Sequence, residues 1–253
     1  MSILIFILIG GVSCALYPIV ATIIITRRNS RTSSYPLFEL KSFEALPPTA
    51  RDYFGPLAVT LQAQGFSDAL YLYQSGQMNG TTCFLMLMKN HNSGDMACAC
   101  DMHVTVKHIY NQMNYLEFVT DLSNGVCINS NNIAQPHIFK ADPKNIVFKF
   151  PGLMDSRQLY QAHRGLVARH APEEQCVLPS EGMEVPYLCS AIVKTLDKQV
   201  EYGYYYQDSK TGDYRPTWKG ASLMTLRVAW PMRDIKLAAL KTEAAQNLRS
   251  LGL

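Results

Sequence analysis

The 253-residue chain lacks the local signatures by which common catalytic sites are recognised. It has no G-x-S-x-G elbow, no phosphate-binding glycine loop and no zinc-protease helix. It also lacks a dense run of Lys and Arg and any DNA- or RNA-binding motif, so no nucleic-acid partner is expected. Internal repeats and low-complexity segments are missing as well. These absences leave no reaction that the sequence assigns by itself.

The seven cysteines lack the paired spacing of a zinc site. Residues 96–107 alternate as a strand. Cys98, Cys100 and Met102 then lie on one face, and His103 lies on the other. We therefore interpret both cysteines as core residues and expect no metal and no cofactor. A cysteine nucleophile that meets a distant histidine in space stays open as an alternative. The candidates for it are Cys83, Cys127, His103, His163 and His170.

What the chain does have is an unbroken apolar run over residues 3–26, followed by Arg27, Arg28 and Arg31. A helix of that length spans a hydrocarbon core of about 30 Å. The run is longer than the h-region of a signal peptide and has no basic residue before it, which favours a membrane anchor over a cleaved leader. The arginines then place the N-terminus outside and the remaining chain in the cytoplasm, at the cell (inner) membrane.

Two small residues inside this run, Gly11 and Ala15, are four positions apart. Such spacing lets another helix approach closely within lipid. It predicts a contact with another membrane protein subunit or self-association. The alternative is that these are small residues of the kind common in any membrane helix.

The C-terminal part is basic, and both tryptophans fall within residues 215–241. Tryptophan favours the headgroup region, and cations favour an anionic leaflet. We expect membrane lipid as a partner of one set of residues. This set is Arg27, Arg28, Arg31, Trp218, Lys219, Arg227 and Trp230. The alternative is that the apolar stripe of this segment packs on the sheet and that its cations are solvated.

The patterns predict an α+β fold: a single N-terminal transmembrane helix, then a soluble domain with a mostly antiparallel sheet of about five strands and several packed helices. Strands are predicted at residues 69–75, 81–89, 96–107, 115–123, 126–130 and 146–150. Helices are predicted at residues 50–64, 156–170, 186–200, 219–230 and 233–251. The predicted organisation is an anchor (1–28), a juxtamembrane linker (29–49), the α+β domain (50–231) and a C-terminal amphipathic helix (232–253).

Asn124-Gly125 is a preferred pair for a two-residue hairpin turn. Polar residues lie on both sides of it, and Thr120 is expected to pair with Asn129 and to share its face. We interpret Thr120, Asn129 and Asn131 as a possible recognition surface. The alternative is that they stabilise the loop that follows.

Two stretches carry a family resemblance. One joins Glu117-Phe118-Val119-Thr120 to Asn124-Gly125 and Asn129-Ser130-Asn131, and the other runs from Tyr214 to Ala221. With the anchor, they resemble a group of uncharacterised bacterial single-pass membrane proteins. That group has no assigned reaction, so the resemblance implies a bacterial membrane location and no catalytic residue.

The sequence therefore favours a non-catalytic accessory or scaffolding subunit, tethered to the cytoplasmic face of a membrane and associated with a membrane protein complex. The alternative is a membrane-tethered enzyme of unidentified reaction that uses Cys/His or hydrolytic chemistry.

Overall fold

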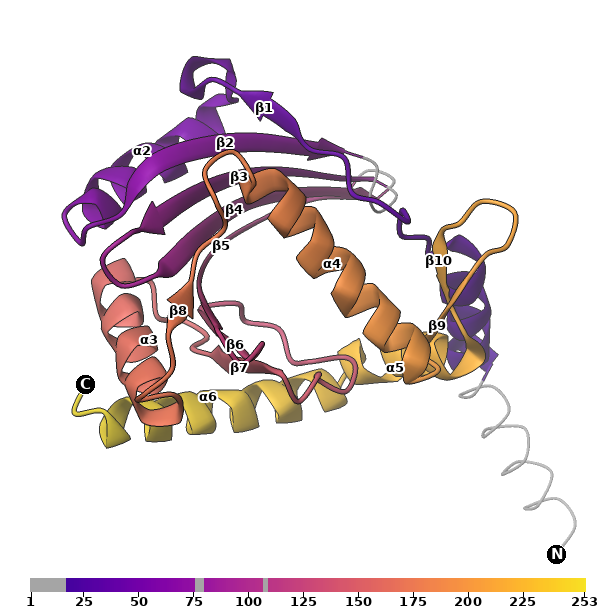
Figure 1. The fold of residues 1–253 in the computed structure, drawn as a ribbon. Helices are drawn as coiled ribbons and strands as arrows, with labels where there is room; N and C mark the ends of the chain where they lie inside the picture. The colour runs from indigo at the N-terminus through magenta and orange to yellow at the C-terminus, as the bar shows by residue number, and fades with distance from the viewer. Residues whose placement is uncertain (1–16, 76–79, 107–108) are drawn as a thin grey trace, which may run out of the picture.

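The computed structural model describes residues 17–75, 80–106 and 109–253, which form an α+β fold around one curved sheet (Figure 1). Gly11 and Ala15 lie outside the described residues. No helix in the described part has the length and apolar composition needed to cross a membrane. This corrects the single N-terminal transmembrane helix that was expected from the sequence. Of the apolar run, the structure describes the part from Tyr17 onward, in a helix that ends at Asn29 after two arginines.

The main sheet has eight strands within the described residues, in the order β1-β2-β3-β4-β5-β6-β7 with β8 beside β5. Their bounds are β1 (Glu39–Lys41), β2 (Ser67–Ser75), β3 (Thr81–Asn90), β4 (Asp95–Val106), β5 (Ile109–Leu122), β6 (Cys127–Asn131), β7 (Asn145–Lys149) and β8 (Cys176–Val177). All pairs are antiparallel except β6 with β7, which are parallel. The expected sheet of about five strands was therefore too small.

The missed strands are β1 and β8, and both are short; β7 corresponds to the strand predicted at residues 146–150. β1 and β8 have three and two residues, too few for an alternating pattern to be seen. β1 also falls within the segment expected to be a linker. β7 follows a connection, residues 132–144, that returns the chain to the end of the sheet where β6 began, as a parallel pair requires.

The β5–β6 hairpin turns at the predicted Asn124-Gly125, but its loop has three residues (123–125) instead of two, because the Leu122 amide donates to the Val126 carbonyl at 2.8 Å. Gly125 has φ +79°, a conformation that glycine adopts without strain, and its amide donates to the Leu122 carbonyl at 2.9 Å. The Asn124 side chain accepts from the Val126 amide at 2.9 Å. Turn chemistry alone therefore located this hairpin.

One face of the sheet is covered by α2 (Pro48–Gln62) and α3 (Ser156–His170). Their apolar sides bury Phe54 and Leu159 against Met86 and Phe118 of the sheet. Asp155 caps α3 by accepting from the amides of Arg157 and Gln158. This face forms the larger core.

The other face is crossed by α4 (Glu184–Glu201), as Figure 1 shows. Its first turns bring Val185 and Leu188 onto a second apolar cluster that includes Cys98 and Cys100. The prediction that these two cysteines are core residues is confirmed, since they are 8% and 0% exposed.

The hairpin of β9 (Tyr205–Gln207) and β10 (Tyr214–Pro216) lies beside α5 (Trp218–Val228) at one end of the molecule (Figure 1). From there α6 (Met232–Ser250) runs back toward α3, and the short η1 (Phe43–Ala45) precedes α2. Helical residues 17–29 pack beside α5, where the Arg27 guanidinium lies 4.6 Å from the centre of the Trp218 ring. The far end of α6 packs on the larger core through Ala244.

Candidate ligand-binding cavity

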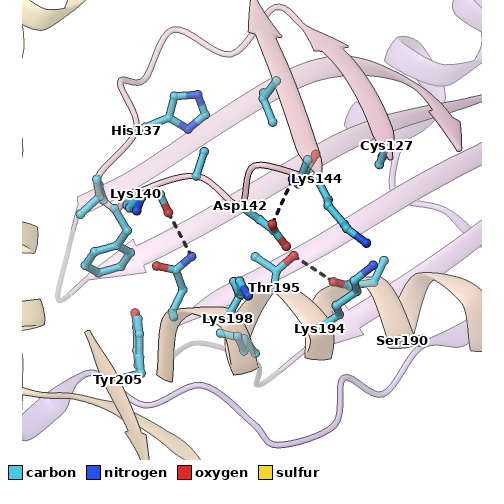
Figure 2. Close-up of a pocket in the computed structure, with 18 of the residues that line it drawn as sticks. Cys127, His137, Lys140, Asp142, Lys144, Ser190, Lys194, Thr195, Lys198 and Tyr205 are labelled. Carbon is cyan, nitrogen blue, oxygen red and sulfur yellow. Dashed lines mark hydrogen bonds between the residues drawn. The ribbon is translucent and has the colours of Figure 1, made fainter. Parts of the chain in front are cut away.

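A cavity of about 500 Å³ lies between α4 and the parallel pair β6–β7 (Figure 2). Its wall is made by the ends of β5 and β6, by the connection from His137 to Asn145 and by one side of α4. The first turns of α4 are packed on the sheet, so its later turns are held over the start of β6 and β7. The volume is within the range of small-molecule sites.

The cavity lining carries more positive than negative charge. Four lysines line it, two from the connection and two from α4: Lys140, Lys144, Lys194 and Lys198. The last two are one helical turn apart, so α4 presents them on the same side. The carboxylates in the lining are Asp121 and Asp142, which leaves an excess of two positive charges at neutral pH.

Two of these lysines already have partners. The Lys198 ammonium is 2.6 Å from a Glu201 oxygen, and the Lys140 ammonium lies 5.0 Å from the centre of the Tyr202 ring. Lys144 and Lys194, on facing elements in Figure 2, have no carboxylate within ion-pair distance among the described residues. Their charges are therefore available to an anion in the cavity.

Two side-chain oxygens in the lining have no hydrogen-bond partner within the described residues. They are Oε1 of Gln199, a residue only 9% exposed, and Oδ1 of Asn145. The Gln199 amide nitrogen donates to the Lys140 carbonyl at 3.5 Å. A buried oxygen without a donor costs roughly 1–3 kcal/mol.

Aromatic and aliphatic side chains form one side of the cavity. The Phe139 ring stacks on Tyr204 with centroids 4.9 Å apart and meets the Tyr205 ring edge-on at 5.5 Å. Ile138 and Val147 continue the apolar surface. A ligand with an apolar or aromatic body and an anionic group matches this lining.

At the end of the cavity nearest β5, the Tyr187 hydroxyl donates to the Asp121 carboxylate. Burial, together with the neighbouring Asp121, raises the pKa of the Cys127 thiol. The thiol therefore stays protonated at neutral pH and is a poor nucleophile. Burial and the hydrogen bond to Asp121 raise the pKa of Tyr187 in the same way. This end of the cavity is arranged for binding, and its thiol is not activated.

A second polar cluster is buried under α3. The Thr120 hydroxyl donates to Asp95 at 2.5 Å and contacts Nε2 of His163 at 2.8 Å, while Nδ1 of His163 contacts the Ser130 hydroxyl at 3.0 Å. Arg164 bonds the same carboxylate at 3.0 Å. Asp95, Thr120, Ser130 and His163 are all fully buried. Ser130 is therefore closed to a substrate, and these hydrogen bonds stabilise the buried interior.

The expected recognition surface is not assembled. Thr120 pairs with Ile128 and not with Asn129, so the two lie on opposite faces of the sheet. Asn129 and Asn131 are on the face toward α4, where Asn131 donates to the half-buried Glu117 at 3.2 Å. The predicted pairing was wrong by one residue. Burial raises the pKa of Glu117, although these asparagines and Lys149 oppose the shift.

The cysteines and histidines named as nucleophile candidates are also separated. Cys83 and Cys127 lie on the sheet face toward α4, whereas His163 is under α3 on the other face and His170 is exposed. His103 bonds the buried Asp101 at 2.9 Å. Among the described residues, no group of three His, Cys, Asp or Glu side chains could hold a metal ion.

Most residues of the expected membrane set bond to other parts of the chain. Lys219 donates to the Tyr202 carbonyl at 2.9 Å, Arg227 to the Ile138 carbonyl at 2.6 Å, and Arg31 lies 3.5 Å from Asp213. Arg28 and Trp230 are exposed. The structure therefore divides this set into residues that hold α5 in place and residues open to a partner.

Sequence reasoning missed the cavity lysines. Lys140 and Lys144 are far along the chain from Lys194 and Lys198, and the pairing of β7 with β6 brings them together. The spacing of Lys194 and Lys198 was the one available signal, because it puts both on one side of the predicted helix.

An α+β fold does not by itself imply a function. The basic, partly apolar cavity is a candidate site for a small molecule. Comparisons with family models, with curated proteins and with solved structures find no match. The functional argument therefore rests on the cavity itself.

Proposed function

We propose that the protein is a non-catalytic binding protein that takes a small organic anion into the cavity beside α4. The observation that carries this proposal is the excess of lysine over carboxylate around a partly apolar space. Lys144 and Lys194 supply charge, and Phe139 supplies an apolar surface. The matching ligand has a carboxylate or phosphate group and an apolar or aromatic body.

The accessory role expected from the sequence stays a prediction, and a binding site without an activated nucleophile is compatible with it. An enzyme with Cys/His or hydrolytic chemistry is less well supported. The Cys127 thiol has a raised pKa, and the Ser130–His163 pair is fully buried.

Anilinonaphthalene sulfonate, an aromatic anion that fluoresces in apolar sites, is a direct probe of this cavity. We expect the full chain to bind it, and Lys194→Glu to weaken the binding at least tenfold, about 1.4 kcal/mol, because an attraction becomes a repulsion. Lys210→Glu is the matched control, since Lys210 is exposed in the turn between β9 and β10.

Fluorescence titration of both variants decides the question. Equal affinity of the wild type and of Lys194→Glu would place the probe elsewhere and contradict the proposal. A thermal unfolding curve that is the same for wild type and Lys194→Glu ensures that lost binding does not reflect lost folding.

A further inference from the structure

The junction of α5 and α6 exposes an unusual number of apolar side chains. Trp230 is 83% exposed, and its neighbours along the chain are also open to solvent. We call this surface the α5–α6 corner; its apolar members are Leu226, Val228, Trp230, Met232 and Ile235. Scattered apolar residues are normal on a surface, but these five are exposed within ten residues of the chain around one helix junction.

Cations flank the apolar side chains of the corner. Arg233 is exposed and Lys236 is half-buried on the first turns of α6. Asp234 is the acidic residue of this stretch, and its carboxylate is 3.9 Å from the Arg233 guanidinium. The corner therefore carries net positive charge around an apolar centre.

The basic residues in this region fall into two groups according to what they contact. Lys219 and Arg227 donate to main-chain carbonyls of Tyr202 and Ile138, so they fix α5 on the protein. Arg233 is exposed and Lys236 is partly exposed on α6, close in sequence to Trp230. Their position beside an exposed tryptophan is the chemistry of an interfacial membrane site, in which the indole enters the headgroup layer and cations contact anionic lipid.

We propose that the α5–α6 corner docks on an anionic lipid surface, with Trp230 inserted at the headgroup boundary. The inference is independent of the cavity, because the two sites share no residue. It assigns the lipid contact expected from the sequence to Trp230, which belongs to the expected set, and to Arg233 and Lys236, which do not.

The test reads the environment of Trp230 directly. The chain has two tryptophans, so Trp218→Phe leaves Trp230 as the sole one and keeps an aromatic ring under Arg27. This full-length variant is mixed with vesicles of phosphatidylcholine alone or with added phosphatidylglycerol. Because the apolar segment 3–26 can itself adsorb to lipid, fluorescence of Trp230 is measured instead of sedimentation.

We expect a blue-shifted emission, quenching by brominated lipid and loss of acrylamide quenching with the anionic vesicles. Charge reversal by Arg233→Glu with Lys236→Glu should reduce these changes severalfold. Arg51→Glu, an exposed change on α2 across the molecule in Figure 1, should leave them intact.

Three results would overturn the proposal. Trp230 could stay open to acrylamide on anionic vesicles, or respond equally to neutral lipid. It could also become shielded without lipid as protein concentration rises, which would show a second copy of the chain on the corner.

Discussion

At the scale of single residues, the cluster under α3 shows how one hydroxyl can satisfy two buried groups. Thr120 has one hydroxyl proton, and it goes to Asp95. We infer that Nε2 of His163 carries the proton of the neutral ring and donates it to Thr120, which leaves Nδ1 to accept from Ser130. Each member then has a partner, and the histidine is held as a neutral ring.

Replacing Thr120 with valine tests this arrangement. Valine keeps the volume but leaves Asp95 and His163 each without one bond, so we expect a loss of about 1–3 kcal/mol in the free energy of unfolding. Thr242→Val on the exposed side of α6 is the control, since Thr242 bonds only its own helix carbonyl at Ala238, and it should change stability by less than about 0.5 kcal/mol. Urea unfolding measures both, and equal losses would contradict the assigned network.

At the scale of elements, close approach explains a glycine in α5. A Cβ atom added at Gly220 would come within 2.0 Å of the Tyr204 carbonyl oxygen, which is backbone and cannot move aside. The first turn of α5 is fixed there, because the Thr217 side chain accepts from the Gly220 amide at 3.1 Å. The close contact between α5 and Tyr204, the residue before β9, therefore requires glycine at position 220.

Gly220→Ala should destabilise the protein by about 1–3 kcal/mol through overpacking. The matched change is Gly55→Ala in α2, where the added Cβ meets Phe43 at an ordinary 3.5 Å. There the higher helix propensity of alanine should raise stability by up to about 1 kcal/mol. Thermal unfolding distinguishes them, and a neutral Gly220→Ala would show that α5 does not pack on Tyr204 as described.

The same scale shows what the sequence could predict. Long elements with a strong period were placed well: the alternation of residues 96–107 is β4, and the periodic stretch from 186 corresponds to α4. Pairing was harder, because a shift of one residue exchanges the faces of a strand and Thr120 is placed opposite Ile128. The cavity was not predictable, since it needs the parallel return of β7 after a connection without a periodic pattern.

At the scale of the whole molecule, the sheet separates two environments. The face under α2 and α3 holds the larger core and the buried His163 cluster, while the face toward α4 holds the cysteine cluster and the cavity. Lys89 and Glu184, 2.5 Å apart, join the start of α4 to the sheet. A substitution in the cavity can therefore alter ligand binding without disturbing the His163 cluster. A substitution in that cluster should instead change the free energy of unfolding.

The stability of the whole fold should consequently fall in mild acid. Burial lowers the pKa of His163 below its ordinary value of 6.5, so between that value and the lower folded pKa the unfolded chain binds a proton that the folded chain does not. Stability is complete above about pH 6.5 and decreases as pH falls, by at most about 1.4 kcal/mol per pH unit. Burial opposes ionisation of Asp95, but hydrogen bonding and attraction from His163, with Thr120, lower its pKa to about 2, so its own loss comes at more acidic pH.

Urea unfolding at a series of pH values between about 7.5 and 4.5 measures this slope. His163→Gln should reduce this slope, and the part that remains is expected from His137, since burial lowers the pKa of His137 to about 4. If His163→Gln does not fold, the ring proton signals of His163 in the wild type give the same answer by titrating well below pH 6.5. A slope as steep as that of the wild type after the loss of His163, or a ring that titrates near 6.5, would mean that protonation of this histidine costs the fold nothing and that the cluster under α3 does not hold it neutral.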